Sequence, residues 1–144
     1  MSNQTSNIEF KDCGFIRNPN SIDVNPNYFV NIGAAKFITI DSSKFEGKAV
    51  LNHIFIQGNS PTNLTEGITI KKSLFTNFSN ESVSINYSKD VIIDKNEFIN
   101  NLTTSSNTNY NIMISSSKNF AITKNKFIIN NVSAIGVNLS LAST

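Results

Sequence analysis

The chain has few of the residues on which disulfides, metal sites and nucleophilic catalysis depend. Its 144 residues include one cysteine, one histidine and no tryptophan. The single Cys13 excludes an internal disulfide and a cysteine-based zinc site. The single His53 leaves little material for a histidine metal site or a Ser-His relay, so we interpret it as a structural or surface residue. The sequence therefore predicts no cofactor and no metal site.

Charge is also scarce. Charged residues make up 15% of the chain, against about 25% in an ordinary soluble domain. The formal net charge is +2, and the longest basic run is the pair Lys71-Lys72. Because nucleic-acid binding needs a basic cluster or stripe, we expect no nucleic-acid partner. No run of 18 apolar residues is present, so we also expect no membrane-spanning helix.

Uncharged polar residues take the place of the missing charge, together with isoleucine and 11 phenylalanines. Disordered chains are poor in aromatic and β-branched residues, so this composition favours a folded protein. Asn, Ser and Thr are unfavourable in helix interiors, and Ala, Leu and Glu are scarce here. The composition predicts a β-rich fold with many Asn-containing turns, and the length predicts a single domain over residues 1–144.

A nine-residue segment ending in phenylalanine occurs five times. The copies are NIEFKDCGF (7–15), FITIDSSKF (37–45), GITIKKSLF (67–75), DVIIDKNEF (90–98) and NFAITKNKF (119–127). The terminal Phe residues lie 30, 30, 23 and 29 residues apart. Intervals of this size are typical of one turn of a solenoid.

Within each copy the apolar residues alternate, as they do in a half-buried strand. Two apolar columns, expected inside, lie seven and five residues before each Phe: Ile8, Ile38, Ile68, Val91 and Phe120, then Phe10, Ile40, Ile70, Ile93 and Ile122. The column between them is expected to point outward: Glu9, Thr39, Thr69, Ile92 and Ala121. Small residues two before each Phe predict an inward-facing turn ladder with steps of about 4.8 Å: Cys13, Ser43, Ser73, Asn96 and Asn125. In this interpretation Cys13 is structural.

Each coil supplies at least one further short strand. We predict strands at Ile22–Val24, Tyr28–Ile32, Val83–Ile85, Ile112–Ile114 and Ile135–Val137, with Val50-Leu51 and Ile54–Ile56 as less regular candidates. Two longer excursions are expected at residues 57–66 and 100–109.

The repeated I-x-I-x-x-[CSN]-x-F pattern resembles that of the right-handed parallel β-helix superfamily, the pectate-lyase-like solenoids. The resemblance covers residues 7 to about 137. It implies an all-β, right-handed, single-stranded parallel β-helix of about five coils. That superfamily includes polysaccharide lyases, glycoside hydrolases and epimerases, and also phage tail spikes and surface adhesins, so the resemblance alone does not assign a function.

The chain lacks the catalytic signatures that the resemblance would require. Pectate lyases are expected to use clustered acidic residues for calcium and an arginine base, yet the only arginine, Arg17, has no acidic cluster around it. Polygalacturonase-like members are expected to carry Asn-x-Asp, Asp-Asp and Gly-His-Gly signatures, whereas His53 lies in LNHIF. We assign no catalytic residue.

One column of charged residues contains two carboxylates that could form a catalytic pair. Four residues before each Phe stand Lys11, Asp41, Lys71, Asp94 and Thr123. Asp41 and Asp94 would lie two steps apart, at about 9–10 Å, near the range of inverting glycosidases. Lys71 between them would keep both ionised, so we predict a surface ladder of ion pairs in preference to an acid catalyst.

The predicted function is a non-enzymatic structural or adhesive module, extracellular or on a particle surface, that contacts a protein or a glycan. The alternative is a carbohydrate-active or carbohydrate-binding domain. Strand patterns run close to both ends, from Ile8 to Leu141, without a capping helix, so we expect a longer solenoid or neighbouring subunits to cover the ends. An apolar outer patch is expected around Leu74, Ile92 and Ala121. Sequons such as that at Asn63 fit a secreted protein.

Overall fold

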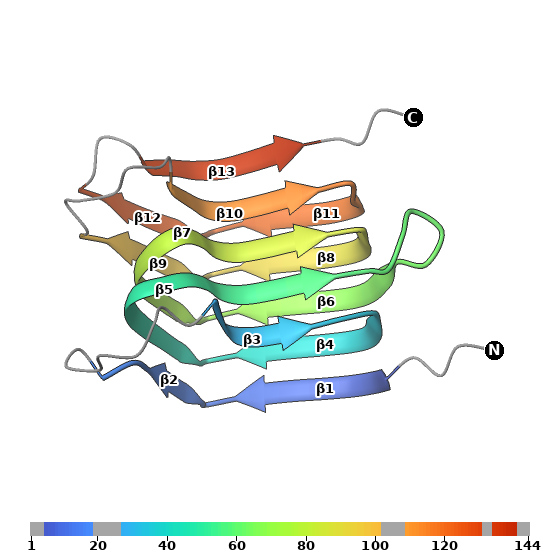
Figure 1. Ribbon diagram of the computed structural model, residues 1–144, viewed down its shortest axis with the longest axis horizontal. Helices are drawn as coiled ribbons and strands as arrows, with labels where there is room; N and C mark the ends of the chain where they lie inside the picture. The colour runs from blue at the N-terminus through green and yellow to red at the C-terminus, as the bar shows by residue number, and fades with distance from the viewer. Residues whose placement is uncertain (1–4, 19–26, 102–108, 131–133, 141–144) are drawn as a thin grey trace.

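The computed structural model describes residues 5–18, 27–101, 109–130 and 134–140, and these residues form thirteen strands and no helix (Figure 1). The strands are β1 (Thr5–Lys11), β2 (Gly14–Ile16), β3 (Tyr28–Ile32), β4 (Ala35–Asp41), β5 (Lys44–Gln57), β6 (Thr65–Lys71), β7 (Leu74–Asn86), β8 (Ser88–Asp94), β9 (Glu97–Asn100), β10 (Asn109–Ser115), β11 (Lys118–Thr123), β12 (Lys126–Ile129) and β13 (Ala134–Ser140).

The strands wind into a parallel β-solenoid. Sheet A contains β1, β4, β6, β8 and β11 in that order, and the remaining eight strands form sheet B. Every pairing between named strands is parallel. In Figure 1 the chain runs leftward along sheet A behind, returns rightward along sheet B in front, and climbs from β1 to β13, which is a right-handed winding. The solenoid makes about four turns, fewer than the five coils predicted, because five stacked rungs are separated by only four steps.

The predicted phenylalanine anchors form one continuous stack. The ring centroids are 4.7 Å apart for Phe15 and Phe45, 4.9 Å for Phe45 and Phe75, 4.8 Å for Phe75 and Phe98, and 5.2 Å for Phe98 and Phe127. The three central rings are fully buried. Close stacking of this kind adds to the free energy gained by removing each ring from water. The register inferred from the sequence is therefore confirmed.

The side chains of the predicted polar ladder accept hydrogen bonds from the backbone N–H groups of the turns. Each backbone N–H donates to the side chain of the next rung: Cys13 to Ser43 Oγ at 3.2 Å, Ser43 to Ser73 Oγ at 3.1 Å, Ser73 to Asn96 Oδ1 at 2.9 Å and Asn96 to Asn125 Oδ1 at 2.8 Å. Buried N–H groups need such partners, and small side chains fit beside the rings. Cys13 fills the first of these positions, as predicted.

A left-handed residue precedes each ladder residue and turns the chain from sheet A to sheet B. These residues are Asp12, Ser42, Lys72, Lys95 and Lys124, with φ between 51° and 56°. A second column in the same backbone region lies six residues before the ladder residues and opens the apolar part of each sheet A strand: Asn7, Phe37, Gly67, Asp90 and Asn119. The left-handed region costs a residue with a β-carbon about 1–2 kcal/mol, so the architecture imposes local strain at both columns.

Replacing Lys72 with glycine is expected to raise the free energy of unfolding by about 0.5–1 kcal/mol. Lys72 is exposed and its φ is 51°, a conformation that glycine adopts without strain. Lys72→Ala keeps the β-carbon and should change stability by less than about 0.5 kcal/mol. Urea denaturation followed by circular dichroism measures both, and a Lys72→Gly protein less stable than Lys72→Ala would contradict this account.

The remaining strands agree with most of the predictions. β3 spans the predicted Tyr28–Ile32, and β7, β10 and β13 contain the other three predicted strands. The two irregular candidates of the second coil merge into the single strand β5, whose register shifts on either side of Val50. The candidate at residues 22–24 lies outside the described residues, as does most of the excursion at 100–109.

Candidate functional site

His53 lies inside the solenoid, where no solvent reaches it. Its ring stacks against Phe29, Phe45 and Phe75 at centroid distances of 5.5, 6.1 and 6.1 Å, and its Nδ1 lies 3.2 Å from Ser82 Oγ. Burial lowers its pKa from 6.5 to about 3, so the imidazole is neutral at physiological pH. Its role is structural, one of the two roles predicted for it.

The Asp41 column lies on the outer face of sheet A, with Asp41 opposite Lys71 and Lys71 opposite Asp94. Lys71 Nζ lies 3.5 Å from Asp41. Asp94 differs from the predicted ladder, because it pairs with Lys95 on its own turn at 3.2 Å and accepts a hydrogen bond from Thr123 at 2.7 Å.

Both carboxylates of this column are held in the ionised form. Partial desolvation raises the pKa of Asp41, but the hydrogen bond from Ser42 and the ammonium group of Lys71 together bring it below its usual value. The Thr123 hydroxyl, followed by Lys95, lowers the pKa of Asp94. A general acid for glycoside hydrolysis needs a raised pKa, which neither group has.

A half-buried carboxyl group lies instead on the outer face of sheet B. Burial raises the pKa of Glu81, against the opposing hydrogen bonds from Asn52, Asn80 and Ser84. The strand register places Asn52 between Tyr28 and Glu81. The rings of Tyr28 and Phe55 lie 4.9 Å apart on the same part of sheet B. Polar and aromatic groups therefore meet on this face.

Within the described ranges, no three His, Cys, Asp or Glu side chains gather closely enough to hold a metal ion. Arg17 follows β2, and its backbone N–H donates to the Glu46 carbonyl at 2.9 Å. None of the described segments forms a helix long and apolar enough to cross a membrane.

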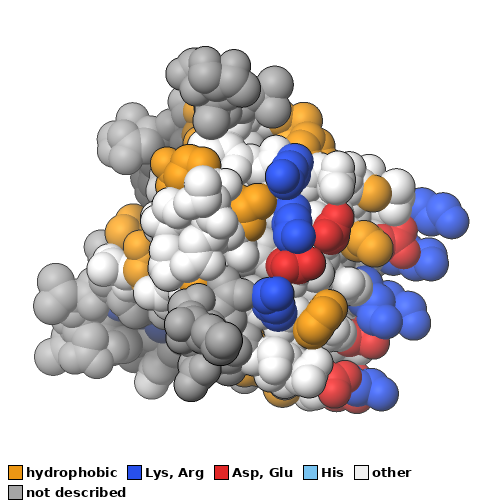
Figure 2. All heavy atoms as spheres, turned by 90° about the vertical axis from the view of Figure 1, so that its right-hand side faces the viewer, with side chains coloured by type: hydrophobic (Ala, Val, Ile, Leu, Met, Phe, Trp, Pro, Cys, Tyr) orange, Lys and Arg blue, Asp and Glu red, His pale blue; other side chains and the backbone are white. Residues whose placement is uncertain are grey.

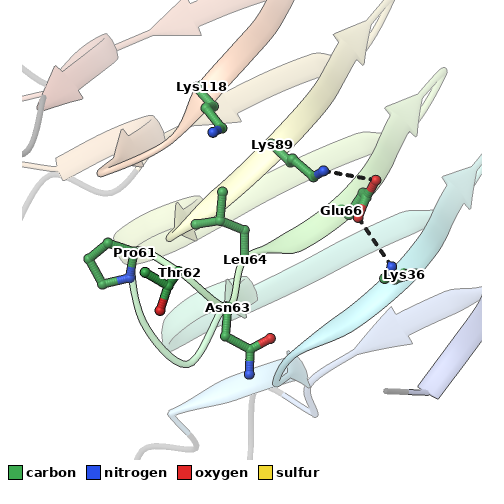
Figure 3. A pocket seen from close by; sticks show the side chains of 8 residues that line it. All are labelled: Lys36, Pro61, Thr62, Asn63, Leu64, Glu66, Lys89 and Lys118. Carbon is green, nitrogen blue, oxygen red and sulfur yellow. Dashed lines mark ion pairs between the residues drawn. The ribbon is translucent and has the colours of Figure 1, made fainter. Parts of the chain in front are cut away.

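A polar groove of about 430 Å³ lies at the edge where the sheet A strands begin. Figure 2 shows this face, with a vertical row of basic side chains interrupted by acidic ones. One wall of the groove is a row of four side chains, one from each of four successive sheet A strands, which we call the cationic row: Lys36, Glu66, Lys89 and Lys118. Its other wall is a loop contributing Pro61, Thr62, Asn63 and Leu64 (Figure 3).

Glu66 organises this cationic row. Its two carboxylate oxygens pair with Lys89 at 3.0 Å and with Lys36 at 3.4 Å (Figure 3). The hydrogen bond from Lys89, with a contribution from Lys36, lowers the pKa of Glu66, so the carboxylate remains ionised at neutral pH. Lys118 makes no ion pair within the described part of the chain, and its side chain is exposed.

The loop wall is fixed to the solenoid by backbone hydrogen bonds. At its two ends, Gly58 N–H donates to the Asn86 carbonyl and Thr65 N–H donates to the Tyr87 carbonyl, both at 3.0 Å. Within the loop, Asn59 N–H donates to the Asn63 carbonyl at 3.0 Å. A β-carbon on Gly58 would lie 2.2 Å from the Tyr87 carbonyl oxygen, so only glycine permits this close approach. The excursion predicted at residues 57–66 is shorter in the structure, where a loop of residues 58–64 between β5 and β6 forms this wall.

Sequence reasoning missed both the cationic row and a second ladder. The row lies nine residues before each anchoring Phe, immediately outside the nine-residue copies that were aligned. The second ladder lies one position earlier, where Ser88 N–H donates to Ser117 Oγ at 3.0 Å and Thr65 pairs with Ser88 in the register. Both columns belong to the repeat, because they occupy the two positions that precede each nine-residue copy from the second copy onward.

Comparison with protein families, with curated proteins and with solved structures finds no match for this chain. A parallel β-solenoid supports many unrelated functions, so the architecture alone does not identify one.

Proposed function

We propose that the chain is a non-enzymatic structural or adhesive β-solenoid module of a cell or particle surface. It stacks against a neighbouring coil or subunit and presents its outer faces to partners. The proposal also places its repeats in the right-handed parallel β-helix, pectate-lyase-like superfamily. The five Phe-anchored segments and the polar ladder between them support that assignment.

The observation that carries the proposal is an apolar hollow on the last described rung. Phe120, Ile122, Phe127, Val137 and Leu139 line it, with Lys124 and Asn125, and its volume is about 480 Å³. The first four belong to columns that are buried in the central rungs. Exposed apolar surface of this kind marks a contact site. Among the described strands, β11, β12 and β13 have no partner on their outer edge, so this edge can accept another strand layer.

Self-association through this rung is the expected behaviour of the isolated chain. Sedimentation velocity should show an average mass that rises with protein concentration, and Phe127→Asp should abolish the rise because it places a charge in the hollow. Lys126→Ala, at the adjacent exposed position, is the matched control and should associate as the wild type does. A wild-type protein that stays monomeric at every concentration would refute stacking between subunits.

Carbohydrate binding is a second candidate, favoured by the polar groove beside sheet A and by the aromatic face of sheet B. Glycoside hydrolysis generally uses two carboxyl groups that flank one bond. Glu81, whose pKa is raised, lies on sheet B, whereas Asp41 and Asp94 lie on sheet A and stay ionised. Glycan binding without turnover is therefore the form of this candidate that we propose.

A further inference from the structure

We propose that the groove between the cationic row and the loop of residues 58–64 binds an acidic oligosaccharide, one that carries carboxylate or sulfate groups. The inference rests on the glycan-binding candidate proposed above and names both the site and the ligand class.

The charge of the cationic row selects an anion. Three lysines and one glutamate give the row a formal charge of 3 − 1 = +2, and Glu66 stays ionised. Lys118 makes no ion pair in the described residues, so its ammonium group is available to a ligand. Lys89 lies directly opposite Lys118 on the neighbouring strand. Strands are spaced about 4.8 Å apart, so a ligand lying along the solenoid axis meets closely spaced cations.

The polarity of the groove favours a saccharide over a peptide or a nucleic acid. Six of the eight side chains that line it are charged or polar, and only Pro61 and Leu64 are apolar. Peptide partners are usually anchored by buried aromatic or aliphatic groups, for which this groove offers little surface. Nucleic acids need a broader basic field than a chain of net charge +2 provides. A volume of about 430 Å³ suits a ligand of a few sugar units.

An exposed aromatic ring beside the cationic row also favours a saccharide ligand. Phe37 follows Lys36, its φ is 56°, and 56% of its surface is exposed. Its ring lies over Gly67, where a β-carbon would approach Phe37 Cδ1 to 3.0 Å. The equivalent residues of the other rungs share this backbone conformation, so the fold imposes it, but they are Asn7, Gly67, Asp90 and Asn119, and Phe37 alone among them presents an apolar ring. An open ring of this kind offers an apolar platform to the C–H face of a sugar.

Isothermal titration calorimetry at low ionic strength tests the site with defined probes. The probes are a hexauronate with one carboxylate per sugar, its uncharged methyl ester, a sulfated hexasaccharide and inorganic sulfate. We expect at least one acidic hexasaccharide to bind, with an affinity that falls as salt is added, and the methyl ester not to bind. The tighter of the two acidic probes identifies the anionic group.

Variants then locate the binding. Lys118→Ala should weaken the hexasaccharide about tenfold, the loss expected for one charge-assisted contact. Glu66→Gln removes the only negative charge of the row and should tighten binding. Phe37→Ala should weaken the saccharide without changing the affinity for inorganic sulfate. Lys72→Ala removes the same charge at the opposite end of sheet A and should bind as the wild type does.

Three outcomes would overturn the inference: no binding of either acidic hexasaccharide, equal losses for Lys118→Ala and Lys72→Ala, or inorganic sulfate binding as tightly as the hexasaccharides. None of them would affect the proposed stacking, because that is tested by the concentration dependence of mass at a different surface.

Discussion

Phe75→Ala is expected to lower the free energy of unfolding by about 3–5 kcal/mol. The ring is fully buried at the centre of the stack, with Phe45 and Phe98 parallel to it within 9° on either side. Truncation leaves a cavity that the neighbouring rungs cannot fill, since their backbones are held by the strand pairing on both sheets. The free energy of unfolding of a domain is typically about 5–15 kcal/mol, so this loss is a large fraction of the total.

Urea denaturation of Phe75→Ala, Phe127→Ala and Lys72→Ala tests the stack in a graded way. Phe127 is only half-buried and has one stacked neighbour, at 5.2 Å, so its truncation should cost less than that of Phe75. Lys72 is exposed, and its truncation should change stability by less than about 0.5 kcal/mol. Equal midpoints for Phe75→Ala and Lys72→Ala would mean that the aromatic column is not the core. If Phe75→Ala does not fold, Phe75→Leu provides the milder comparison.

His53 is expected to make the folded state sensitive to mild acid. Its pKa is about 3 in the folded protein, because burial excludes the charged form, and 6.5 is the ordinary value that applies in the unfolded chain. Between these values the unfolded state binds one proton more than the folded state, so stability falls as the pH is lowered. Well above pH 6.5 both states are neutral at this residue and its contribution is constant. The expected loss is about 2 kcal/mol between pH 6.5 and pH 5.

Unfolding free energies of the wild type and His53→Phe at pH 7, 6 and 5 isolate this effect. The variant keeps a ring in the aromatic cluster and removes the titration, so the difference between the two proteins should shift by about 2 kcal/mol in favour of the variant on acidification. Carboxyl groups titrate in both proteins, and their contributions cancel in the difference. Ser82→Ala, which removes only the hydroxyl near Nδ1, should keep the wild-type pH dependence. Identical slopes for the wild type and His53→Phe would show that His53 takes up a proton in the folded state.

The rungs of the fold were predictable because the sequence repeats the same local pattern of residues five times. An apolar pair, a small residue and a Phe recur at fixed spacing, and stacking like residues buries the three central rings and gives the ladder N–H groups from Cys13 to Asn96 a partner. Tyr28–Ile32 was found by the same alternation. The merging of two candidates into β5 was not, because the register shifts around Val50 interrupt the period on which the prediction depends.

The candidate site was less visible in the sequence. The row of Lys36, Glu66, Lys89 and Lys118 lies just outside the aligned copies, and its facing wall comes from a loop that has no counterpart in the repeat. The ion pair of Asp94 also differed from the expectation, since the turn at Lys95 supplies a cation closer than Lys71. Long charged side chains select partners by distance in space, and periodicity does not specify those distances.

The sequence by itself determined the strands, the register and the chemistry of the core. Buried columns tolerate few residue types, so their identity can be recognised from spacing alone. Only the tertiary structure decided that His53 is enclosed by aromatic rings, that Phe37 is left open to solvent, and that a loop closes over a cationic row. Those features depend on where irregular segments return to the solenoid. Contacts between residues far apart in the sequence hold these segments in place, and the local repeat does not specify such contacts.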